Sequence, residues 1–263
     1  MQALRGTREM QLLLPLSPAS AGKDPHAPTR LGRVDLPILE GVAKVAVQGQ
    51  RAYVTTFSRL RIVDIANPAA PQLVGSYSGF YSVAGTAVRG DRAFVVAQTD
   101  AVSPFYLFLI DVSNPAAPTL LSQTAGCQDP AYSPDRLAVS GDGTRAYVAA
   151  SGCGTLEIFD TSNAVAPVLL GRYQPLDDGI NPVNDVALAP DGKLYAGTAL
   201  GVDLVDVSNP AAPVQLERVT PLASSAARVS RSASGLLMFF SYRQDGVATY
   251  AEDRMFSDGF DGH

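Results

Sequence analysis

The chain of 263 residues contains only two histidines, His26 and His263, and only two cysteines, Cys127 and Cys153. Both histidines lie near the ends of the chain, which argues against a Ser–His–Asp catalytic site and against a histidine-based metal site. A Gly-rich phosphate-binding loop is also missing, because GTALG at 197–201 has the length and composition of a hairpin turn. These absences leave carboxylates as the main catalytic groups that the sequence offers.

The charge and the apolar runs argue against two kinds of partner. The formal net charge is −5, and the 20 lysines and arginines are scattered, so the sequence has no basic patch for nucleic acid or for an anionic membrane surface. No apolar run approaches the ~20 residues that a membrane-spanning helix needs. The chain is instead 46% hydrophobic with 23 glycines and 19 prolines, which is typical of a globular protein with many turns.

One string of eight residues, DVSNPAAP, occurs at 111–118 and again at 206–213, and looser copies occupy 64–71 and 160–167. The aspartates that open these strings are 47, 49 and 46 residues apart. Each repeat contains four short runs rich in Val, Ile, Leu and Tyr that are bounded by Gly, Pro, Asn and Asp, a pattern typical of strands joined by hairpin turns. Four antiparallel strands at a period of about 40–50 residues predict the blade of a β-propeller.

A fifth repeat near the C-terminus is degenerate and supplies three strand-like runs, which begin near residues 227, 236 and 246. The missing fourth run is found at the other end of the chain, because residues 24–36 match the tail of a repeat. We therefore predict an all-β fold, a five-bladed β-propeller of four-stranded antiparallel blades. An N-terminal strand at 31–36 closes this ring by joining the C-terminal blade.

The ends of the chain fall outside this predicted domain. Residues 1–23 are expected to form a leader or a disordered N-terminus, residues 24–251 the single propeller, and residues 252–263 a C-terminal tail. The stretch MQLLLPLSPASAG at 10–22 has the small residues that end a secretory signal, but its apolar part is short and a proline interrupts it. The first 22 residues are therefore either a clipped start or a disordered leader.

The strings IVDIANPAAP, LIDVSNPAAP and LVDVSNPAAP, each followed by a short apolar run, resemble the LVIVD repeat of bacterial surface and secreted β-propellers. The resemblance covers about residues 24–251 and implies a bacterial protein that is secreted, periplasmic or on the cell surface. It implies no substrate, because the family has no generally established activity. Repeats of the family often carry an aspartate just before the inner strand, which this chain keeps at Asp185. The other repeats have Lys44, Gly85, Arg136 and Ala227 there.

The connections of an antiparallel blade alternate between the two faces of the disc. The turns between strands one and two and between strands three and four, with every NPAAP string, fall on what we call the repeat face. The remaining connections differ between repeats and fall on the opposite face, which we call the variable face. Functional residues usually lie on variable loops over a rigid scaffold, so we expect them on the variable face. The NPAAP strings have a structural explanation, because Asp and Asn bond to nearby backbone N–H groups and Pro ends a strand.

Cys127 and Cys153 are both expected on the variable face of one blade. They form either a disulfide or two unpaired thiols, and we predict the disulfide. Closing this loop of 26 residues stabilises the fold by roughly 3–4 kcal/mol if the disulfide acts by lowering the conformational entropy of the unfolded chain. Such a bond is typical of an oxidising compartment and therefore of a secreted protein.

The variable face also gathers oxygen ligands, aromatic rings and charges. The connection at 175–185 offers carboxylate and amide oxygens of the kind that Ca²⁺ prefers, although the same composition is typical of a solvated turn. The candidate metal ligands are Asp177, Asp178, Asn181 and Asp185. Aromatic residues beside charged ones suit a sugar or peptide surface. The candidate ligand-binding residues are Tyr81, Tyr132, Arg136, Asp185, Lys44 and Arg243.

We interpret the sequence as a monomeric, non-enzymatic binding scaffold, secreted or on the cell surface, that captures a protein or glycan ligand on its variable face. It needs no cofactor apart from the Ca²⁺ considered above. The alternative is a carbohydrate-active hydrolase with two carboxylates roughly 5–9 Å apart in the central funnel. The carboxylates that this alternative draws on are Asp185, Asp135, Glu40 and Asp100.

Overall fold

The computed structural model describes residues 30–36, 41–128, 136–175, 182–219, 228–231, 237–242 and 246–251. Apart from two short 3-10 turns, η1 (Ser151–Cys153) and η2 (Pro190–Gly192), all regular structure in these segments is β-strand. Each strand pairs antiparallel with the next one along the chain, and the strands form separate small sheets. The predicted all-β class is therefore confirmed.

Four of the sheets have four strands, and we call them blades 1 to 4 in chain order. Blade 1 comprises β1 (Val42–Gln48), β2 (Arg51–Thr56), β3 (Arg59–Asp64) and β4 (Gln72–Ser78). Blade 2 comprises β5 (Ser82–Arg89), β6 (Arg92–Gln98), β7 (Tyr106–Asp111) and β8 (Thr119–Ala125). Blade 3 comprises β9 (Arg136–Val139), β10 (Arg145–Ala150), β11 (Thr155–Asp160) and β12 (Val168–Tyr173). Blade 4 comprises β13 (Val183–Leu188), β14 (Leu194–Thr198), β15 (Gly201–Asp206) and β16 (Val214–Val219).

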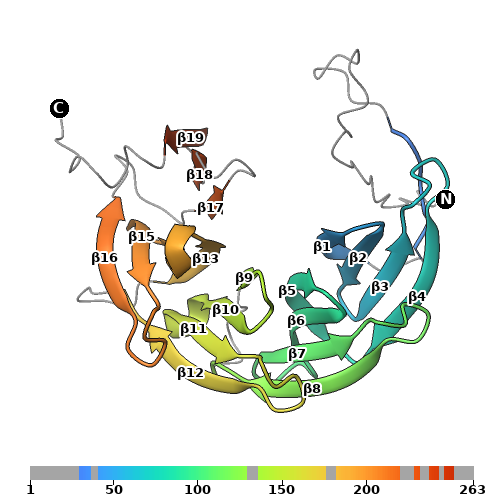
Figure 1. Cartoon of the computed structure of the whole chain (residues 1–263), viewed down its shortest axis with the longest axis horizontal. Coiled ribbons are helices and arrows are strands. Elements are labelled where there is room, and N and C mark those ends of the chain that lie inside the picture. The colour runs from blue at the N-terminus through green and yellow to red at the C-terminus, as the bar shows by residue number, and fades with distance from the viewer. Residues whose placement is uncertain are drawn as a thin grey trace, which may run out of the picture.

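A last sheet has three strands, β17 (Arg228–Arg231), β18 (Leu237–Tyr242) and β19 (Gly246–Ala251). The sheets follow one another around a centre, with the first strand of each sheet innermost and β4, β8, β12 and β16 at the rim (Figure 1). The inner strands contact one another in sequence, β1 with β5, β5 with β9, β9 with β13, and β13 with β17. This arrangement is that of a β-propeller.

The predicted count of five four-stranded blades is wrong for the described residues, which form four such blades and the three-stranded sheet. Residues 30–36 are in neither a strand nor a sheet, so the predicted pairing of 31–36 with the last sheet is not found in the described part of the chain. Side-chain packing holds this segment instead, because Val34 and Leu36 pack against the core of blade 1. The packing of residues 30–36 against blade 1 does not depend on backbone hydrogen bonds to the last sheet, which the prediction assumed.

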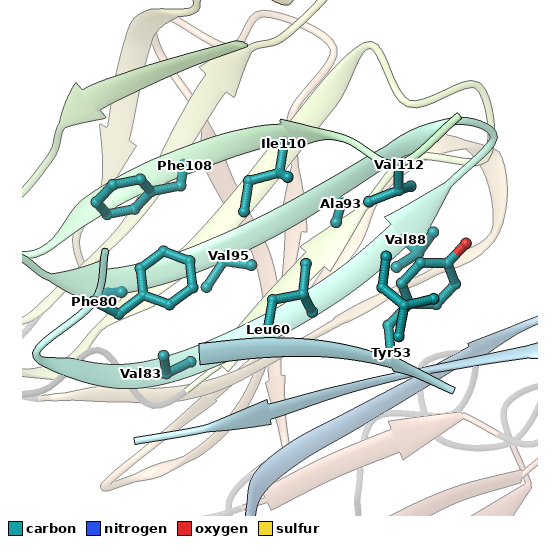
Figure 2. Close-up of a cluster of buried hydrophobic side chains, with 12 residues drawn as sticks. Tyr53, Leu60, Phe80, Val83, Val88, Ala93, Val95, Phe108, Ile110 and Val112 are labelled. Carbon is teal, nitrogen blue, oxygen red and sulfur yellow. The ribbon is translucent and has the colours of Figure 1, made fainter. Parts of the chain in front are cut away.

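The apolar core lies between neighbouring blades, and the middle strands are buried on both faces. In β6 all residues after Arg92 are buried, which explains why RAFVVAQ reads as a continuous apolar run. Figure 2 shows the cluster between blades 1 and 2, where Leu60 of β3 faces Val95 and Ile110 of blade 2. Each large side chain buried there contributes about 1.5–3 kcal/mol relative to exposure. The rim strands, in contrast, are mostly exposed or half-buried.

The repeated string forms the connection from the third to the fourth strand through two consecutive side-chain turns. In blade 2, Asp111 Oδ1 accepts the N–H of Ser113 at 2.8 Å, and Asn114 Oδ1 accepts the N–H of Ala116 at 3.2 Å. The same two bonds recur in the other three blades. The hydrogen bonds from Ser113 hold the pKa of Asp111 below its ordinary value. These bonds support the structural interpretation of the string.

The string also fastens each blade to the one before it. A Cβ added to Gly75 in β4 would overlap the carbonyl oxygen of Pro115 in the string of blade 2, and Gly171 in β12 approaches Pro210 in the same way. Gly32 makes the equivalent approach to Pro68 in blade 1. Residues 30–36 therefore occupy the position against blade 1 that the rim strand of one blade occupies against the next blade.

Candidate functional site

Four equivalent positions near the start of the inner strands form what we call the axial ring. The inner strands have register shifts between Val42 and Lys44 in β1, between Val83 and Gly85 in β5, and between Val183 and Asp185 in β13. Such a bulge inserts one residue and redirects the side chains beside it. The ring positions are Lys44, Gly85, Arg136 and Asp185.

Asp185 of β13 contacts both neighbouring inner strands, β9 and β17. Its side chain is buried, its Oδ1 accepts the N–H of Val186 at 2.9 Å, and its Oδ2 accepts the N–H of Val229 in β17 at 3.2 Å. Arg136 Nε of β9 lies 3.8 Å from Asp185 Oδ1, close enough for an ion pair and too far for a hydrogen bond. A carboxylate that already accepts two backbone N–H groups is a poor nucleophile or base, so the geometry gives Asp185 a positioning role.

Two N–H donors beside Asp185 have no hydrogen-bond acceptor among the described residues. They are Arg136 Nε and the side-chain amide nitrogen of Asn184, and both atoms are buried. The rest of the Arg136 side chain reaches solvent, since 41% of it is exposed, but its Nε atom does not. Sequence reasoning counted Asn184 among the oxygen-bearing residues of the connection at 175–185, but it did not predict an unpaired side-chain amide at the bulge of β13.

Large apolar side chains are exposed on the variable face at the loops of blades 1 and 2. Phe57 in the β2–β3 turn and Tyr81 before β5 are each 55% exposed, and Val102 in the β6–β7 loop is 79% exposed. The neighbouring Phe80 is buried instead, and its ring makes an edge contact with Phe108 at 5.1 Å between centroids. Tyr81 is thus available to a ligand, whereas Phe80 belongs to the core.

The predicted disulfide between Cys127 and Cys153 is present, with the two Cα atoms 6.1 Å apart. It lies beside a cavity of about 10 Å³ between blades 2 and 3, lined largely by apolar side chains such as Val96 and Val148. That volume is about what one water molecule needs. The cavity is therefore too small to be a ligand site.

Two buried carboxylates that sequence reasoning missed lie between blades. Glu157 of β11 pairs with Arg172 of β12 at 2.8 Å and also accepts the N–H of Cys127 at 3.0 Å. Burial raises the pKa of Glu157, and the hydrogen bond and charge of Arg172 counteract part of that rise. Asp203 of β15 occupies the equivalent position in blade 4. The signal in the sequence was a charged residue within the apolar runs TLEIFD and GVDLVD.

The sequence model of the LVIVD repeat matches residues 41–79, 83–125, 134–175 and 195–220, more than half of the chain. The chain belongs to the LVIVD repeat family. The first three matches span blades 1 to 3, and the fourth spans β14 to β16 of blade 4. The resemblance of the IVDIANPAAP-type strings to the LVIVD repeat is thereby confirmed.

Solved structures with the same fold include a functionally unknown protein from Desulfotomaculum acetoxidans, with a TM-score of 0.68 and 14% identity over 84% of this chain and 69% of that one. A protein from Lactobacillus plantarum has a TM-score of 0.67 and 16% identity over 80% and 67%. A periplasmic gluconolactonase from Pseudomonas aeruginosa has a TM-score of 0.59 and 14% identity over 77% and 63%. Such identities show the fold alone. No curated protein matches this LVIVD-repeat chain.

The structure brings some of the predicted site residues together. Arg136 and Asp185 are neighbours in the axial ring, Lys44 occupies the equivalent position in blade 1, and Tyr81 is exposed on the variable face. The remaining candidates, Tyr132, Arg243, Asp177, Asp178 and Asn181, lie outside the described residues. Within the described segments no three Asp, Glu, His or Cys side chains cluster as metal ligands would, and no helix is long and apolar enough to cross a membrane.

Proposed function

We propose that this LVIVD-repeat protein is a non-enzymatic binding scaffold that captures a protein or glycan ligand on its variable face. The observation that carries the proposal is the exposure of Phe57, Tyr81 and Val102 on three loops of that face. Exposed aromatic side chains contribute large contact areas at low entropic cost, and they are enriched at binding surfaces.

The state of Asp100 and Asp185 favours binding over glycan hydrolysis; the other two candidate carboxylates, Asp135 and Glu40, lie outside the described residues. Asp100 Oδ1 accepts the N–H groups of Val102 at 2.9 Å and Ser103 at 2.7 Å, and it shapes the β6–β7 loop. Asp185 is held by two backbone N–H groups. Hydrolysis requires one carboxyl to donate a proton and a second to attack or to activate water, and engaged carboxylates are poorly suited to either role.

An extracytoplasmic location and a closed ring complete the proposal. The disulfide between Cys127 and Cys153 is typical of an oxidising compartment. The approach of Gly32 to Pro68, equivalent to that of a rim strand, supports pairing of residues 31–36 with β19. Such pairing would remove the exposed edge of the last sheet.

The test is a glycan and peptide array probed with the full chain, with the Phe57→Ser/Tyr81→Ser variant and with Val165→Ser as a matched control. Val165 is 67% exposed and lies on the repeat face. We expect the double variant to lose at least about tenfold in affinity, since two buried aromatic contacts together contribute more than about 1.4 kcal/mol, and the control to bind normally. Hydrolysis of a glycan or of a gluconolactone that Asp185→Asn abolishes would contradict the proposal.

A further inference from the structure

The disulfide between Cys127 and Cys153 holds a hydrogen-bond donor against a buried charge. The backbone N–H of Cys127 donates to Glu157 Oε2 at 3.0 Å, and the side chain of Glu157 is only 2% exposed. The backbone of Gly126 lies directly on the same carboxylate, since a Cβ added to Gly126 would overlap Oε2. The Cys127 N–H and the Arg172 guanidinium are the two hydrogen-bond donors that the described residues offer to Glu157.

The equivalent carboxylate in blade 4 is bound without a disulfide. Asp203 accepts hydrogen bonds from Arg218 and from the hydroxyl of Tyr173, and both side chains project from strands. In blade 3 the second donor is instead a backbone N–H that lies outside any strand, because β8 ends two residues before Cys127. The position of that N–H therefore depends on the bond to Cys153.

Glu157 and Cys127 also line the same cavity of about 10 Å³ between blades 2 and 3. The other side chains that line it are apolar, apart from Tyr106 of β7. This space admits at most about one water molecule, so Glu157 depends on its protein donors. Burial already raises the pKa of Glu157 above its ordinary value, and a buried carboxylate that loses a donor binds a proton still more readily.

We propose that the disulfide and Glu157 form a redox switch, in which a dithiol reduces the S–S bond, the Cys127 N–H leaves the carboxylate and Glu157 takes up a proton from solvent. The two S–H groups of the dithiol supply two electrons and two protons to the sulfur atoms of Cys127 and Cys153, and the dithiol becomes a disulfide. The attacked sulfur is that of Cys153, which is partly exposed at the end of η1. Sulfur atoms that are no longer bonded must move apart, which releases the Cys127 backbone. The switch acts on a connection of the variable face and does not depend on the binding function proposed above.

The coupling between reduction and protonation works in both directions. Reduction increases the proton affinity of Glu157, so protonation of Glu157 favours reduction, and the equilibrium constant for reduction should rise as the pH falls. The loss of one hydrogen bond to a charged group corresponds to about a tenfold to a hundredfold change in this constant. The other titratable side chains that face Glu157 are Arg172 across the sheet and Tyr106 across the cavity, and both are unchanged in every protein compared below.

The experiment equilibrates the full chain with mixtures of reduced and oxidised dithiothreitol between about pH 5 and 7.5, below the ~8.5 of an ordinary cysteine thiol. The thiols of protein and reagent stay protonated over this range, so without coupling the equilibrium constant does not depend on pH. Acid quenching, alkylation of free thiols and intact mass give the reduced fraction. The proteins are wild type, Glu157→Gln and the matched control Glu217→Gln, since Glu217 is exposed on β16 of blade 4.

We expect the equilibrium constant to rise at least about tenfold toward low pH in wild type and in Glu217→Gln. It should stay constant in Glu157→Gln, because glutamine still accepts the Cys127 N–H but takes up no proton. A constant value in wild type, or the same rise in Glu157→Gln, overturns the inference.

A second measurement tests the switch without any reductant. The carbon-13 shift of the Glu157 carboxyl, assigned by its absence in Glu157→Gln, is followed against pH in oxidised wild type and in Cys127→Ser/Cys153→Ser. The titration midpoint should be at least about one pH unit higher in the double variant, which is the same tenfold change. Equal midpoints in the two proteins contradict the inference.

Discussion

Replacing Arg218 by methionine should destabilise the fold strongly, because it leaves a buried charge without its main partner. Asp203 of β15 is 0% exposed and lies opposite Arg218 of β16 in the sheet register. Arg218 Nε donates to Asp203 Oδ1 at 2.5 Å and Nη2 donates to Oδ2 at 3.0 Å. The hydroxyl of Tyr173, from the rim strand of blade 3, donates to Oδ2 at 2.6 Å. The carboxylate thus joins blades 3 and 4.

The magnitude follows from what remains in Arg218→Met. Asp203 keeps only the Tyr173 hydroxyl, and breaking a buried pair by removing one partner costs about 3–5 kcal/mol. This is a large part of the roughly 5–15 kcal/mol that holds a typical domain folded. The double variant Asp203→Leu/Arg218→Met should recover most of the loss, because no charge is left buried. Tyr173 then retains Gln215 Oε1 as an acceptor at 3.0 Å.

The assay is urea unfolding of wild type and of both variants, with midpoints compared at an unchanged slope. Arg172→Met is the matched control, since Arg172 pairs with Glu157 in blade 3 but 45% of its side chain is exposed. Burial raises the pKa of Glu157, so this carboxyl can take up a proton when Arg172 is removed, and the control should lose less stability at mildly acidic pH. A loss below about 1 kcal/mol for Arg218→Met, or a double variant as unstable as the single one, would refute the reasoning.

Two further predictions concern the repeat face. Hydrogen bonds from Ser140 and Thr144 lower the pKa of Asp142 from 3.8 to about 2, so its contribution to stability is present above pH 3.8 and is lost as the pH falls toward 2. Acid unfolding should therefore be shallower for Asp142→Asn than for wild type over this range, and identical curves would contradict the assignment. Gly75→Ala should lower the melting temperature, since its Cβ would overlap the string of the next blade, whereas Gly141→Ala, which meets nothing within 4 Å, should not.

The disulfide and the repeated turns could be predicted because their chemistry is local or follows from blade geometry. The side chain of Asp111 bonds to a backbone N–H only two residues along the chain, so the string DVSNPAAP carries its own conformation. The alternation of connections between two faces placed Cys127 and Cys153 together without any knowledge of side-chain packing. Both features depend on chain order alone.

The ion pairs between side chains of neighbouring strands could not be predicted from the sequence. Asp203 meets Arg218 only because a register shift between Leu204 and Val205 sets the pairing of β15 with β16. The closing strand was a similar case. The match of residues 24–36 to a repeat tail predicted pairing with the C-terminal blade, whereas in the described structure Val34 and Leu36 pack against blade 1 without strand pairing.

The sequence by itself determined the strands, the turns and the blade period, because each of these depends on residues within one hairpin. Only the tertiary structure decided which polar groups of neighbouring blades meet, because those contacts join residues far apart in the chain. Asp185 reaches the N–H of Val229, 44 residues away, and leaves the donors of Arg136 and Asn184 without an acceptor. No periodicity reveals an unpaired donor, since pairing depends on distances between atoms of different blades.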